Sequence, residues 1–152
     1  MNNLKIILSL NSLPLIIGIG SQLLYFHCLK KYFTLSFFLY KKDLGVAMLA
    51  YSVALFGIVA TISTVIYGLN NIATKKYLDD YGDYYCSSWL IALIYLMLTA
   101  FTSVLLLATT SDNVVIWILR LTLFLFIASL IQSLLAMWTG INLLKKKQKD
   151  TP

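Results

Sequence analysis

Four apolar blocks divide the sequence, and each is long enough to cross the hydrocarbon core of a membrane. A spanning helix needs about 20 mainly apolar residues, because each residue adds about 1.5 Å along a path of about 30 Å. The sequence therefore predicts an all-α integral membrane protein with a single membrane domain and a lysine-rich tail at residues 145–152. Only four residues separate the last two blocks, which predicts an antiparallel hairpin. The predicted spans are residues 6–29, 44–69, 88–109 and 114–144.

The composition argues against a water-soluble protein. Only 12% of the 152 residues are charged and 60% are hydrophobic, whereas soluble domains carry about 25% charged residues. The net charge of +6 comes from basic residues at the edges of apolar blocks. This placement predicts contact with membrane lipid and not with nucleic acid. Glutamate is absent and all six aspartates lie outside the blocks, so we expect no catalytic site, metal or cofactor in the membrane.

The distribution of basic residues also predicts an orientation. The side with the N-terminus, the second loop and the tail carries seven lysines, and the opposite side carries four lysines and Arg120. Because the more basic side of a membrane protein usually stays inside, both termini are expected on the same face, inside. Three tryptophans, Trp89, Trp117 and Trp138, stand near predicted span ends. We expect them in the aromatic belts at the membrane interfaces.

Small residues form a regular stripe along the second block. In lipid, helices associate through close packing of small residues, and a spacing of 3.5 residues implies left-handed packing at shallow angles. The stripe therefore predicts a left-handed four-helix transmembrane bundle in which the second span is central and this helix-packing seam faces protein. A pore or substrate path lined by small residues is the alternative. The seam residues are Ala47, Ala50, Ala54, Gly57, Thr61, Thr64 and Gly68.

Looser stripes with compatible spacing occur in the first and fourth blocks, and polar amides lie among them. Because amides within spans usually bond across helices, we expect Asn11, Gln22, Gln132 and Asn142 to join helices, and amides that line a water-filled route are the alternative. Arg120 is the only charge inside a block, and it is expected to form an interfacial ion pair with Asp43 or Asp112. The two stripes are Asn11, Pro14, Gly18, Ser21 and Tyr25 in the first block, and Thr122, Ser129, Ser133, Ala136 and Gly140 in the fourth.

The segment between Asn70 and Ser87 is the most distinctive polar part of the sequence. It combines three aspartates with four tyrosines, and aromatic residues concentrate at protein interfaces. The segment therefore predicts a loop that docks onto another protein, and a solvated turn with its rings at the headgroups is the alternative. The four tyrosines are Tyr77, Tyr81, Tyr84 and Tyr85.

These features favour a non-catalytic structural or accessory subunit of a larger multi-subunit membrane complex. The expected partners are membrane lipid and other integral membrane subunits. A homo-oligomeric channel or small-solute facilitator is the alternative, with the small-residue stripes lining a path between protomers. The two hypotheses differ in the behaviour of the purified chain, since a channel forms a defined oligomer that conducts and an isolated subunit is unstable.

Overall fold

The computed structural model is helical over almost all of the residues that it describes, which are residues 2–24, 27, 39–68 and 72–149. Three of its helices are long and apolar enough to cross a membrane, over Lys41–Ile66, Gly82–Ala108 and Asn113–Ile141. The apolar part of the first helix, Ser12–Leu24, is shorter, and much of residues 25–29 of the predicted first span lies outside the described residues. The helices are α1 (Asn2–Leu24), α2 (Lys41–Gly68), α3 (Ile72–Ala108) and α4 (Asp112–Lys149).

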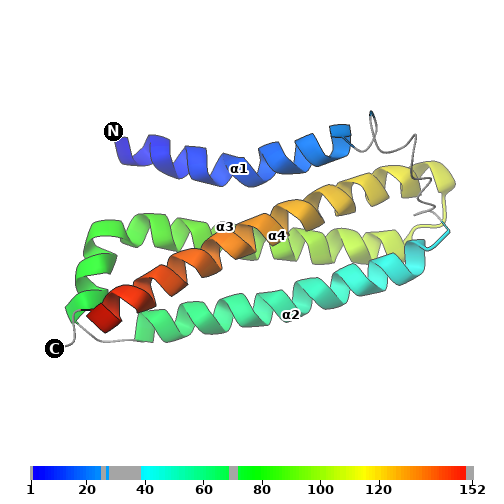
Figure 1. The fold of residues 1–152 in the computed structure, drawn as a ribbon. Coiled ribbons are helices and arrows are strands. Elements are labelled where there is room, and N and C mark those ends of the chain that lie inside the picture. Colours follow the sequence, from blue (N-terminus) through cyan, green and yellow to red (C-terminus); the bar gives the residue numbers. More distant parts are fainter. Residues whose placement is uncertain (1, 25–26, 28–38, 69–71, 150–152) are drawn as a thin grey trace.

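The helices α3 and α4 form the centre of the bundle, with α1 and α2 on either side of them (Figure 1). The predicted hairpin is confirmed, since α3 ends at Ala108 and α4 begins at Asp112. The backbone N–H of Val115 donates to the carbonyl of Ser111 at 2.9 Å, which places Ser111 at the N-cap of α4. Serine is a preferred N-cap residue, so the local sequence favours this helix start.

The interior of the bundle is rich in small polar residues. Most of their hydroxyls donate to carbonyls one turn earlier in the same helix, as Thr99 does to Tyr95 at 2.7 Å and Thr122 to Ile118 at 2.8 Å. The hydroxyl of Ser133 is an exception among the described residues. Bonds of this kind satisfy a hydroxyl proton without a partner on another helix. Small polar residues can therefore line a buried interface. The buried small polar residues are Ser52, Thr99, Thr102, Ser103, Thr122, Ser129 and Ser133.

The prediction that the second span is central is wrong. Of the apolar stretch of α2, 22% is buried inside the protein, against 33% for both α3 and α4. A stripe of mostly large residues on α2 packs inward, and it steps by 3 and 4 residues just as the small-residue stripe does. Its members are all buried or half-buried: Gly45, Met48, Ser52, Leu55, Val59, Ile62 and Ile66.

Glycines allow large side chains of neighbouring helices to approach closely. A Cβ atom at Gly140 of α4 would lie 3.1 Å from Cδ1 of Ile66 and 3.3 Å from Cζ2 of Trp89. At Gly45 of α2, a Cβ atom would lie 3.0 Å from Cδ2 of Leu107. Large residues on one helix thus fill the space left by small residues on another, which is the close packing that a protein interior requires.

The polar segment before the third span is helical, so the prediction of a loop there is wrong. Helix α3 begins at Ile72, ten residues before its apolar stretch starts at Gly82. The helix bends, and its first turns run across the end of the bundle (Figure 1). The tyrosines of this segment are therefore presented by a helix.

Candidate functional site

The small-residue face of α2 points away from the rest of the bundle. All seven seam residues, from Ala47 to Gly68, are exposed. A Cβ atom added at Gly57 or Gly68 would meet no described atom within 4 Å. The prediction that this seam packs within the bundle is wrong, because the opposite, larger stripe of α2 occupies that interface.

An open groove of about 450 Å³ runs along this exposed face. The hydroxyl of Thr61 donates to the carbonyl of Gly57 at 2.7 Å, and that of Thr64 to the carbonyl of Ala60 at 2.9 Å. These bonds use the hydroxyl protons within α2, so the groove presents a nearly apolar surface. The groove is lined by Val53, Ala54, Gly57, Ile58, Thr61 and Ile62.

The side-chain amide of Gln132 joins helices α3 and α4. The Nε2 atom of Gln132 donates to the backbone carbonyl of Ser88 at 3.1 Å and to its hydroxyl at 3.3 Å. The prediction that Gln132 joins helices is confirmed. The fourth-span stripe from Thr122 to Gly140 is also buried as predicted. Gln132 and the buried stripe of α4 therefore serve the internal packing of the chain.

Helix α1 is held against α4 by a similar bond and by one close contact. The Nε2 atom of Gln22 donates to the backbone carbonyl of Arg120 at 2.7 Å. A Cβ atom at Gly18 would lie 2.7 Å from Cε2 of Phe124, so only glycine fits against this ring without a shift. Pro14 and Gly18 are buried and Ser21 is half-buried, as the stripe predicts, while the side chains of Asn11 and Tyr25 lie outside the described set.

We expect leucine at Gly18 to displace α1 from α4, because the larger side chain collides with the ring of Phe124. Spin labels at the exposed Leu13 and Leu130, with both cysteines replaced by serine, would report the displacement as a longer interhelical distance. Gly20 is the matched control, since it is exposed and a Cβ atom there meets no described atom within 4 Å. An unchanged distance in Gly18→Leu would contradict the prediction.

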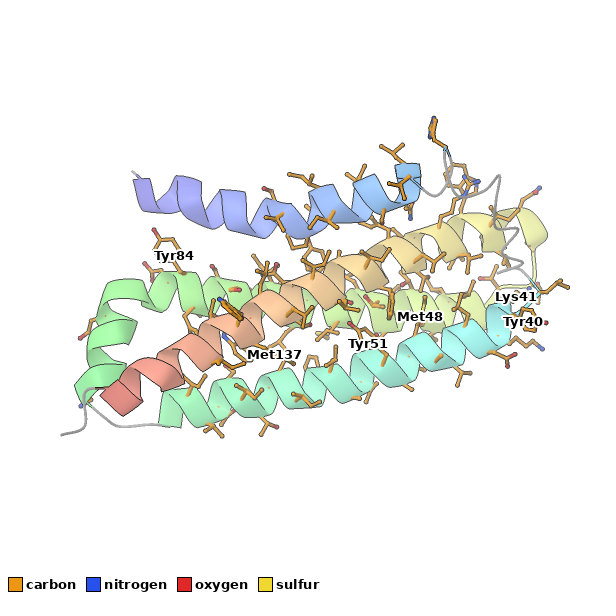
Figure 2. The ribbon with its side chains drawn as sticks, in the orientation of Figure 1. Tyr40, Lys41, Met48, Tyr51, Tyr84 and Met137 are labelled. Carbon is orange, nitrogen blue, oxygen red and sulfur yellow. The ribbon has the colours of Figure 1, made fainter. Side chains whose placement is uncertain are left out.

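The four tyrosines predicted to dock onto another protein have different environments. Tyr85 is only 1% exposed, and its ring centroid lies 5.5 Å from that of Trp89. Tyr84 is half-buried, on the side of α3 that faces α1 (Figure 2). The side chains of Tyr77 and Tyr81 lie outside the described set. A docking role for Tyr85 is therefore wrong, because its ring belongs to the core.

The tryptophans also divide into two groups. Trp89 is buried against α2 and α4, so the prediction that its ring faces the lipid headgroups in an interfacial belt is wrong. Trp117 and Trp138 are both exposed on α4. The guanidinium carbon of Arg120 lies 5.4 Å from the ring centroid of Trp117, within the range of a cation–π contact.

The ion pair expected for Arg120 remains a prediction. Asp43 is exposed in the first turn of α2, and the side chain of Asp112 lies outside the described set. Among the described residues, no group of three or more histidine, cysteine, aspartate or glutamate side chains is placed to hold a metal ion. The open face of α2 is therefore the strongest candidate for a functional surface.

Comparison with known proteins gives no relative: no family model matches the chain, and neither a curated protein nor a solved structure matches it.

Proposed function

We propose that this chain is a non-catalytic structural or accessory subunit of a larger multi-subunit membrane complex, and that another subunit packs against the open face of α2. The observation that carries the proposal is the outward direction of the small-residue seam around Gly57. In lipid, covering an apolar face brings no hydrophobic gain, so helices associate through close van der Waals contact. A face of alanine, glycine and threonine lets a second backbone approach closely.

The hydrogen bonds that other polar groups form within this chain support the same proposal. Gln22 and Gln132 join helices of this chain, and the buried hydroxyls of Thr99 and Thr122 bond to their own helix. Among the features that the structure describes, the groove of α2 is therefore the one best suited to contact another subunit.

The positions of the two chain termini support the proposal of an integral membrane protein with both termini on the same face of the membrane. We propose that this face is the inner one. The first turns of α1 and the last turns of α4 lie at the same end of the bundle (Figure 1). Four crossings would produce this arrangement, with α1 crossing beside the three longer spans. The lysines at residues 145–147 and 149 belong to this end, where basic residues favour the inner side.

The test is to purify the tagged chain from its native membrane in mild detergent. We expect Gly57→Leu to lose the co-purifying membrane subunits, because leucine fills the groove and separates the two backbones. The matched control is Gly20→Leu, which adds the same side chain at another exposed glycine, on α1. This variant is expected to retain the subunits.

Two outcomes would overturn the proposal. Undiminished subunits with Gly57→Leu would show that the α2 face is not the packing surface. A defined oligomer of the chain alone that conducts in lipid bilayers would support the alternative, a homo-oligomeric channel or small-solute facilitator, in which a second copy covers the face.

A further inference from the structure

Two exposed tryptophans on α4 are spaced by the thickness of a membrane. Trp117 is 70% exposed and Trp138 is 63% exposed. Their separation of 21 positions in the sequence corresponds to about 32 Å of helix, and the hydrocarbon core is about 30 Å thick. Tryptophan is enriched at both membrane interfaces. The two rings therefore mark two boundaries, provided that the chain is inserted as the proposed function requires.

One exposed face of α3 changes from charged to apolar at a single point. Lys75, Asp79 and Asp83 are exposed on its first turns. Leu90 and Ile94 are exposed on the same face farther along the helix, since the steps are 4, 4, 7 and 4 residues. A helix surface that passes from water into lipid changes in this way. The boundary on α3 therefore lies between Asp83 and Leu90.

The boundary on α3 and that on α4 lie at the same level. Gly140 of α4 is close enough to Trp89 of α3 that an added Cβ atom would lie 3.3 Å from its ring. Trp138 is therefore beside the start of the apolar face of α3. Two independent markers, the exposed indole on α4 and the change of polarity on α3, give one interface at this end of the bundle.

The first turns of α3 lie at this interface. Figure 1 shows them running across the end of the bundle, and not along its axis. A helix that crosses the end of a membrane-spanning bundle lies in the plane of the membrane. We propose that the first turns of α3, from Ile72 to the start of its apolar stretch at Gly82, form an interfacial helix in the phospholipid headgroup layer.

The charges of this segment indicate which headgroups it contacts. Lys75 and Asp79 are both exposed and are four residues apart on one face, so phospholipid phosphates and amines can each meet an opposite charge. The segment holds two lysines and three aspartates. It is therefore not the cluster of basic residues that recruits anionic lipid, and its partner is the zwitterionic headgroup layer.

Spin labels placed singly at residues 75, 79, 83, 90 and 94 test the inference, with Cys28 and Cys86 replaced by serine. The protein is reconstituted in phosphatidylcholine vesicles, and depth is measured from relaxation by oxygen and by a water-soluble nickel chelate. We expect labels at Leu90 and Ile94 in lipid, and labels at Lys75 and Asp79 at one common headgroup depth, with the label at Asp83 between the two levels. Added phosphatidylglycerol should leave these depths unchanged.

The alternative outcomes are distinct. A straight helix normal to the membrane would place residue 75 about 6 Å farther into water than residue 79, and that gradient would overturn the inference. A shift of the labels toward the membrane on adding phosphatidylglycerol would overturn the zwitterionic assignment. Labels at 90 and 94 that are exposed to water would instead remove the membrane insertion on which the proposed function rests.

Discussion

Leucine in place of Gly140 is expected to lower the free energy of unfolding by about 2–3 kcal/mol, the cost of overpacking a filled interior. Even the first added carbon would lie 3.1 Å from Ile66 and 3.3 Å from Trp89, so the larger side chain forces α2 and α3 away from α4. The measurement is an equilibrium unfolding titration in mixed detergent micelles, followed by circular dichroism.

The matched control is Gly57→Leu, at a glycine that faces outward with no described atom near its Cβ position. We expect this variant to stay within about 0.5 kcal/mol of the parent. Gly140→Ala should lie between the two, because it adds the Cβ atom alone. Equal losses of stability at Gly57 and Gly140 would contradict the packing described above and would favour the seam as the buried face.

Alanine in place of Tyr85 is expected to cost about 3–4 kcal/mol, the usual loss when a large aromatic side chain is removed from a core. The ring is buried against Trp89 in the cluster shared by α2, α3 and α4. The same unfolding titration measures the loss. Tyr84→Ala is the neighbouring control and should cost less than about 1 kcal/mol, since its side chain is half-buried.

A loss of stability in Tyr84→Ala as large as that in Tyr85→Ala would contradict this prediction, since it would show that the half-buried ring contributes as much to the core.

The burial of Tyr85 also affects how a docking role of this segment can be tested. Serine at Tyr81, Tyr84 and Tyr85 together would destabilise the fold, so release of a partner by that variant would not identify a docking surface. Gly57→Leu changes the exterior alone and is the better probe.

The features that could be predicted from the sequence are those that depend on the local pattern of apolar and polar residues. The length and hydropathy of each block predict helices that can cross a membrane, and the short connection at residues 110–113 predicts the α3–α4 hairpin. The role of Gln132 was also predictable, because an amide in an apolar span needs a partner on another helix. The helical structure of the polar segment at residues 72–81 was not predictable, since its composition suits a loop and a helix equally well.

Which face of α2 packs inward was decided only by the tertiary structure. The helix carries two stripes with the same 3–4 spacing, one of small residues through Gly57 and one of larger residues through Val59. Both satisfy the period of a helix-packing seam. The interfaces offered by α3 and α4 are already rich in small residues, such as Ala136 and Gly140. Close packing places large side chains against small ones, so the larger stripe of α2 is buried and the small-residue stripe remains open.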